Sequence, residues 1–199
     1  MELSDAIARR HMTRSFDGRA VPAAVVDRVL SAGLHAPSAG FTQGWAFVVL
    51  EGPEQTDAVW AAVEDADRRA GSTRQGRERA PVVVLALCSA AEYTARYAEA
   101  DKIGGGLDQE AAWPVPYWFC DTAMAVMLML LAAVEEGLGA LWFGLFRDEV
   151  PLLGSLGVPP GWRAVGGLAL GWPDGRDHPS PSLKRARRPL DEVVHRAGW

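Results

Sequence analysis

The longest apolar run of the chain, Ala123–Val134, is the feature that most constrains its fold. It lies inside a predicted helix over Asp121–Glu136, which ends at Gly137, a residue type that commonly follows the last turn of a helix. Because such a helix is apolar on most of its surface, we expect it to be central and buried on most sides. The run is shorter than the roughly 20 residues of a membrane-spanning helix, so we expect a soluble, cytoplasmic protein.

Composition narrows the class of protein further. The chain has 199 residues, of which 49% are hydrophobic and 23% charged, which is typical of one compact globular domain. The net charge of −5 argues against nucleic-acid and membrane partners, because proteins that bind those surfaces are usually basic. Cys88 and Cys120 both lie in apolar segments and predict two buried free thiols in a reducing compartment. No Cys/His spacing suggests a metal site.

Apolar periodicity predicts helices and strands that alternate without repeated βαβ units, which indicates an α+β fold with one sheet flanked by helices. Gly71–Arg79 and Asp101–Pro116 are expected to be loops. The remaining predicted helices cover the residues before Arg9, Val21–His35, Glu54–Arg69, Ala90–Ala100, Asp148–Leu156 and Leu190–Arg196, and the predicted strands are Trp45–Leu50, Pro81–Leu87, Leu138–Phe146 and Ala164–Leu170.

Three short segments suggest a ligand site. Arg9–Arg14 and Lys184–Arg188 are basic clusters far apart in the sequence, and guanidinium groups suit a phosphate dianion because they donate two parallel hydrogen bonds. The small residues of Pro37–Gly40 would let backbone groups approach a planar ligand. Each segment also has an ordinary interpretation, since the clusters could be solvated charge runs and the turn a simple helix stop.

Taken together and in order, these segments resemble the nitroreductase family. RRHMTRSF (Arg9–Phe16) is similar to the family's basic stretch, and HAPSAGFTQGWAFVVL (His35–Leu50) to its A-P-S-x-x-N-x-Q-P-W loop and following strand. The long apolar helix with its G-L-G exit, the strand at Trp142–Phe146 and the basic motif before P-L-x-E-V at Arg185–Val194 are similar too. The matches span Ala6 to Val194, nearly the whole chain.

The resemblance implies an FMN-dependent oxidoreductase that passes two electrons from NADH or NADPH to a nitroaromatic, quinone or similar small acceptor by a ping-pong mechanism. It implies a single domain over residues 1–199 with a mostly antiparallel sheet, in which residues 171–199 form an arm onto the partner subunit of a homodimer. Two FMN sites would lie at the interface and use residues of both chains. Because the flavin carries the redox chemistry, we name no catalytic residue.

The resemblance also implies residue roles. The basic residues would bind the FMN phosphate and ribityl chain, the turn would contact the edge of the isoalloxazine ring, and the end of the third strand would present backbone N–H groups near N5 and O4. The implied cofactor-binding residues are Arg10, His11, Met12, Arg14, Pro37, Ser38, Ala39, Phe41, Phe143, Gly144, Leu145, Arg185 and Arg187.

Three residues depart from the family pattern. Met12 replaces the usual Ser, Phe41 the usual Asn, and Gly44 the usual Pro. The loss of two polar contacts could weaken FMN binding or favour a deazaflavin, and Phe41 could instead add an aromatic wall to the substrate pocket. The aromatic segment Trp113–Phe119 could be packing and dimer contacts, or a lid that stacks an aromatic substrate. The candidate substrate residues are therefore Phe41, Trp113, Tyr117 and Trp118.

Two other functions stay open at this point. One is a flavin-dependent oxidase or dehydrogenase of a biosynthetic intermediate, which uses the flavin in the opposite direction. The other is a non-catalytic protein that binds flavin or deazaflavin, which the departures at Met12 and Phe41 would favour.

Overall fold

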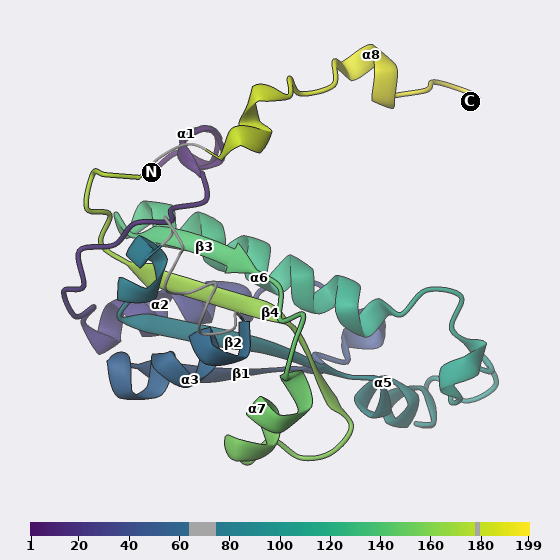
Figure 1. Cartoon of the computed structure of the whole chain (residues 1–199). Coiled ribbons are helices and arrows are strands. Elements are labelled where there is room, and N and C mark those ends of the chain that lie inside the picture. The colour runs from purple at the N-terminus through teal and green to yellow at the C-terminus, as the bar shows by residue number, and fades with distance from the viewer. Residues whose placement is uncertain (64–74, 178–179) are drawn as a thin grey trace.

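The computed structural model describes residues 1–63, 75–177 and 180–199 and has a four-stranded sheet at its centre (Figure 1). The strand order is β1-β2-β4-β3, and each neighbouring pair is antiparallel. The α+β class and the antiparallel sheet predicted from the sequence are therefore confirmed. The strands are β1 (Trp45–Glu51), β2 (Val82–Ser89), β3 (Gly139–Phe143) and β4 (Trp162–Gly171).

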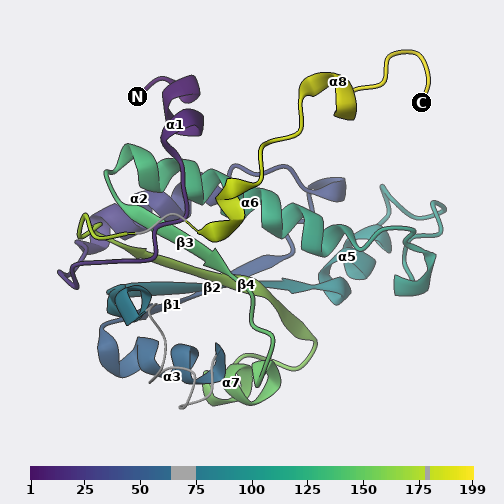
Figure 2. The same ribbon diagram turned by 45° about the horizontal axis from the view of Figure 1, so that its top comes forward.

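Helices cover both faces of this sheet (Figure 2). One face carries α2 (Ala23–Gly33) and α6 (Tyr117–Glu135), and the other carries α3 (Pro53–Val63) and α7 (Glu149–Ser155). The remaining α-helices are α1 (Leu3–Arg9), α5 (Ala90–Tyr97) and α8 (Leu190–Val193). Short 3-10 turns lie at Ala39–Phe41, Gln75–Arg79, Glu110–Ala112 and Pro181–Lys184.

The central strand β2 forms the middle of the core. All of its residues are buried because it has a strand on each side and helices on both faces. Alternate side chains point to opposite faces, so Val82 and Val84 pack toward α2 and α6, whereas Val83 and Leu85 pack toward α3 and α7.

Helix α6 begins four residues earlier than predicted, at Tyr117 rather than Asp121. Pro116 precedes it directly, at a position where a missing backbone N–H costs no helical hydrogen bond. The first turn is anchored by Trp118, which is buried. The aromatic segment Trp113–Phe119 is therefore partly helical.

One side of α6 remains uncovered. Met124 and Met127 are each 40% exposed, and Cys120 is exposed as well, so the prediction that both cysteines are buried holds for Cys88 only. Among the described residues α6 is the one helix long and apolar enough to cross a membrane, by length and composition. It nevertheless packs against α2 and the sheet, and core helices of soluble proteins pass the same test.

The ends of several other elements differ from the predictions. The third strand stops at Phe143 instead of Phe146, and the last helix at Val193 instead of Arg196. The last six residues of the predicted helix Glu54–Arg69 and the start of the loop Gly71–Arg79 lie outside the described residues.

The end of the C-terminal arm, with α8, extends away from the body of the molecule (Figures 1 and 2). Every residue from Pro181 to Trp199 is exposed, and the hydrogen bonds that we find for residues 180–199 all lie within the arm. The exposure of residues 181–199 fits the predicted docking of the arm on a partner subunit, which stays a prediction.

Two consecutive glycines in β4 let aromatic rings lie against the sheet. A Cβ atom on Gly167 would lie 2.3 Å from the ring of Phe143, and one on Gly166 would lie 2.7 Å from the Phe143 carbonyl oxygen and 2.6 Å from the Trp142 ring. Strand β3, which leads to the predicted flavin edge, is therefore held close to β4 by the absence of side chains at these positions.

We predict that Gly166→Ala lowers the free energy of unfolding by about 1–3 kcal/mol, and by more than Gly167→Ala, because a backbone carbonyl cannot turn aside as a ring can. Urea denaturation measures the change. Gly154→Ala in α7 is the control, since open space lies beyond its Cβ position. Equal losses for Gly166→Ala and Gly154→Ala would contradict the prediction.

Candidate functional site

The N-terminal basic segment is fixed to the edge strand β3. Met12 forms a parallel bridge with Ala140, and the Thr13 N–H donates to the Ala140 carbonyl at 2.9 Å. The Met12 sulfur accepts a hydrogen bond from the backbone N–H of Trp142 at 3.4 Å. The methionine that departs from the family pattern thus contacts the strand itself.

Two arginines of this segment, Arg10 and Arg14, are half-buried. The Arg14 side chain donates to the Met12 carbonyl at 2.9 Å, and the Arg14 backbone N–H donates to Asp177 at 3.0 Å. Within the described part of the chain we find no carboxylate paired with Arg10, whose backbone N–H bonds to Ala6. Half-buried cations with free donors fit an anionic group such as a phosphate.

A cavity of about 140 Å³ lies beside the segment, at the C-terminal end of α6. His11, Thr13 and the turn Gly137–Ala140 line it. The Thr13 hydroxyl is buried and has no hydrogen-bond partner, and a Cβ atom on Gly139 would lie 2.7 Å from the Thr13 methyl carbon. A polar ligand bound next to the basic side chains would give this buried hydroxyl a hydrogen-bond partner.

The loop 37–41 lies at the other end of α6 and is held by its own hydrogen bonds. The Phe41 N–H donates to the Ser38 carbonyl at 2.9 Å, and the Gln43 N–H donates to the Ser38 hydroxyl at 2.9 Å. Gly40 and Phe41 both have left-handed backbones, with φ of 63° and 55°. The Phe41 side chain is 73% exposed.

A buried carboxylate supports this loop. Asp121 is 2% exposed and accepts the Ala39 N–H and the Tyr93 hydroxyl, each at 2.8 Å. Burial and this neighbouring carboxylate raise the pKa of Tyr93 far above its usual value, so the phenol stays protonated and keeps donating. The only sequence signal for this contact is an acidic residue in an otherwise apolar helix.

The two halves of the predicted site lie far apart within one chain. Asp121 contacts the loop near the start of α6, whereas Leu130 and Val134 line the cavity next to His11. A helical rise of about 1.5 Å per residue places roughly 20 Å between residues 121 and 134. One chain therefore does not bring the loop 37–41 to the basic segment.

The end of β3 shares an edge strand with the basic segment. Phe143 is half-buried and packs on Trp60 at 4.8 Å between ring centroids, and Gly144 and Leu145, also half-buried, follow it. About 3.3 Å per residue along a strand places Gly144 roughly 13 Å from Ala140, where Met12 is bound. An elongated ligand with an anionic end and a planar end would fit along this edge.

The basic residues of the arm lie elsewhere. Arg185 and Arg187 are exposed, and within the described ranges no hydrogen bond or ion pair connects them to the basic segment of the same chain. Their predicted convergence with Arg10 and Arg14 would thus require a different chain or a different arm position.

The predicted substrate residues differ in exposure. Trp118 is 7% exposed and Trp113 half-buried, and the two rings meet edge to face with centroids 6.1 Å apart. Trp113 also packs on Tyr97 at 4.8 Å. Core packing thus accounts for Trp118, whereas Tyr117, at 40% exposure, and Phe41 offer open ring surface.

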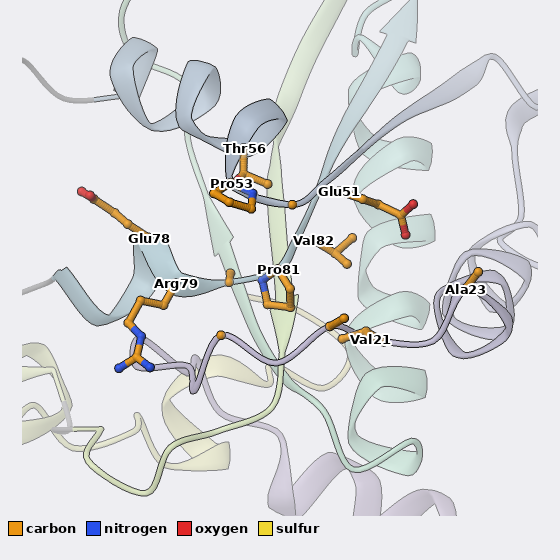
Figure 3. Close-up of a pocket in the computed structure, with 13 residues that line it drawn as sticks. Val21, Ala23, Glu51, Pro53, Thr56, Glu78, Arg79, Pro81 and Val82 are labelled. Carbon is orange, nitrogen blue, oxygen red and sulfur yellow. The ribbon is translucent and has the colours of Figure 1, made fainter.

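A larger hollow of about 620 Å³ lies where β1 ends and β2 begins and contains none of the predicted site residues (Figure 3). Val21, Pro53, Pro81 and Val82 give it an apolar lining, and Thr56 contributes a buried hydroxyl without a partner.

Comparison with known proteins identifies the family. The model of the Nitroreductase family matches residues 7–172, so the chain belongs to this family and is an enzyme of the nitroreductase type. It is 29% identical to 5,6-dimethylbenzimidazole synthase of Rhodospirillum rubrum, over 90% of this chain and 87% of that protein.

Two further proteins are similar to the chain. A Methanothermobacter thermautotrophicus protein provisionally named an NADH dehydrogenase/NAD(P)H nitroreductase is 27% identical over 75% of this chain and 64% of its own length. A crystal structure from Desulfovibrio desulfuricans, of a provisionally named nitroreductase in complex with FMN, has a TM-score of 0.68 at 24% identity and covers 98% of this chain and 95% of that one. This last likeness confirms the fold.

We predict that Asp121→Ala lowers the free energy of unfolding by about 2–4 kcal/mol, because it leaves the Ala39 N–H and the Tyr93 hydroxyl buried without an acceptor. Tyr93→Phe removes one donor and leaves the carboxylate its other hydrogen bond, so its loss should be about 1 kcal/mol. Chemical denaturation of both variants measures the difference. A loss for Asp121→Ala no larger than that for Tyr93→Phe would show that the carboxylate does not hold the loop.

Proposed function

We propose that the protein is a cytoplasmic, homodimeric FMN-dependent oxidoreductase that takes two electrons from NADH or NADPH and passes them to a nitroaromatic, quinone or similar small acceptor. The observation that carries the proposal is the edge of β3: Met12, in the segment with the half-buried Arg10 and Arg14, bridges to Ala140, and Gly144 directly follows the end of the same strand. The names of the archaeal relative and the Desulfovibrio structure support NAD(P)H and FMN. When bound, FMN supplies a ring that accepts and releases hydride.

At one end of this edge, Arg10 and Arg14 would bind the phosphate, and the Thr13 hydroxyl would gain a partner. At the other end, Gly144 and Leu145 would present backbone N–H groups to the ring edge, where charge develops on reduction. The ligand would have one hydrogen-bond donor fewer than with the usual serine. The space is nevertheless filled, because the Met12 side chain bonds to the backbone of Trp142.

A second subunit would complete the site. The exposed face of α6 carries Tyr117, Cys120, Met124 and Met127, and a hollow of about 350 Å³ lined by Leu131 continues it toward α1. Two α6 helices packed antiparallel about a twofold axis would bury this apolar face. The same pairing would place the loop 37–41 of one subunit beside the basic segment of its partner, which one chain cannot do.

The relative from Rhodospirillum rubrum favours a second candidate function. Its name describes a synthase, and its similarity extends over nearly the whole chain. This fits the alternative of a flavin-dependent oxidase of a biosynthetic intermediate, with O2 as electron acceptor. Product analysis under air with and without NAD(P)H separates the two: acceptor reduction needs NAD(P)H, whereas substrate oxidation proceeds without it.

We predict that the purified protein, after addition of FMN and desalting, shows the absorption bands of oxidised flavin at about one FMN per chain, and that NAD(P)H bleaches them. The double variant Arg10→Met/Arg14→Met should bind FMN at least about tenfold more weakly, because hydrogen bonds to charged groups are lost. A spectrum that stays flat for the unaltered protein would overturn the flavin mechanism.

We predict that Met127→Glu converts the dimer to a monomer and abolishes FMN retention in the same step, because it buries charges at the seam of a site that needs two chains. Light scattering after size exclusion measures the mass, and the absorption spectrum measures the flavin. Val150→Glu is the matched control, since Val150 is 74% exposed on α7, away from this face. A monomer that still holds FMN would contradict the shared site.

A further inference from the structure

The peptide group between Gly40 and Phe41 is held at both ends. Its carbonyl oxygen, on Gly40, accepts a hydrogen bond from the Arg96 Nε at 3.0 Å. Its N–H, on Phe41, donates to the Ser38 carbonyl at 2.9 Å. Because one rigid plane carries both groups, these two contacts fix the orientation of the plane and hence the backbone angles on either side of it.

This orientation is unfavourable for Phe41 itself. A φ of 55° places a bulky residue in the left-handed region, which residues other than glycine and asparagine rarely adopt. Rotation of the peptide plane would relieve the strain, and the bond from Arg96 opposes that rotation. Such strain persists only where the surroundings over-determine the conformation, and it is typical of functional loops.

Arg96 is itself held firmly at the end of α5. Its Nη1 and Nη2 donate to the two carboxylate oxygens of Asp101 at 2.7 Å each, and Nη1 also reaches Glu99 at 3.1 Å. The bidentate pair leaves Nε directed at the loop, and the Arg96 side chain is 21% exposed. These bonds hold the pKa of Asp101 at about 2, so the pair stays ionised throughout the neutral range.

The loop fits against the same helix on its other side. A Cβ atom on Gly40 would lie 2.8 Å from the Tyr97 ring, so the glycine lets the loop approach α5 closely. Tyr97 also packs on Trp113, in the aromatic segment that follows Asp101. Arg96 and Tyr97 therefore connect the strained loop to the segment on the acceptor side of the proposed site.

We propose that Arg96 is a positioning residue: it holds Phe41 in its left-handed conformation and thereby sets the direction of the exposed phenyl ring, which selects flat aromatic acceptors. This rests on the proposed function, in which the loop 37–41 borders the flavin. Without the Arg96 bond the peptide plane rotates, and the ring leaves the position in which it stacks on an acceptor.

The first test needs no cofactor. Hydrogen exchange of the flavin-free protein near neutral pH, resolved by amide, compares Arg96→Met with Arg163→Met. The control has the same type of bidentate pair, with Glu149 at 2.9 and 3.0 Å, and lies outside the loop. The amides of Phe41, Thr42 and Gln43 should exchange at least about tenfold faster in Arg96→Met and not in the control. Equal exchange in the two variants would overturn the proposal.

A double-variant comparison tests whether strain at Phe41 is the cause. Asn tolerates the left-handed region far better than Phe, so Phe41→Asn removes most of the tendency to rotate. In that background Arg96→Met should accelerate exchange by less than about threefold, against about tenfold in the parent. The same acceleration in both backgrounds would show that Arg96 does not act through Phe41.

The third test uses the FMN-loaded enzyme with NADH and two acceptors, the aromatic quinone menadione and the non-aromatic ferricyanide. Arg96→Met should raise the KM for menadione and lower the ratio of kcat/KM for menadione to that for ferricyanide by about tenfold. Arg96→Lys, which keeps one donor, should recover part of the ratio. An unchanged ratio with faster loop exchange would overturn the role in acceptor choice. Absent flavin reduction in the unaltered enzyme would instead reject the proposed function and leave the exchange result standing.

Discussion

Burial of helix α6 is the constraint on which the rest of the structure depends. A helix that is apolar on nearly all sides cannot bury its whole surface against one sheet. Here the sheet and α2 cover only part of it. The core forms where β2 and α6 meet, and the uncovered face with Met124 and Met127 remains for another partner. In the proposed dimer the hydrophobic effect that folds the chain would also assemble the site.

The length of α6 determines how that site would be divided. Asp121 holds the loop 37–41 at the start of the helix, and His11 and Thr13 line the cavity near its end. Twofold symmetry makes such a separation useful, because antiparallel helices bring the start of one beside the end of the other. The end of the C-terminal arm is consistent with the same division, since the exposed residues 181–199 are free to bind a second copy.

Sequence patterns predicted the layers of the fold well but the site only in outline. Strands and helices follow from apolar periodicity, so β2 and α6 were expected close to where they lie. Periodicity does not report which polar side chains meet across distant segments, and for that reason Asp121 and Arg96 were not predicted. The exposure of Cys120 was missed because an apolar segment indicates burial without saying whether its own chain or another provides the cover.

Two of the three departures from the family pattern, Met12 and Phe41, have different physical consequences. Met12 has a structural role in the fold: its sulfur accepts a hydrogen bond from β3, and its side chain packs against both core clusters. Phe41 does not contribute to the core in this way: it is exposed and its backbone is strained. It keeps its conformation because Arg96 and Ser38 fix the adjoining peptide. An asparagine there would take the same backbone at little strain and would need no such support. In this chain Arg96 instead holds the backbone behind an exposed phenyl ring. This arrangement argues that the Phe41 ring, and not the loop backbone alone, contributes to the site.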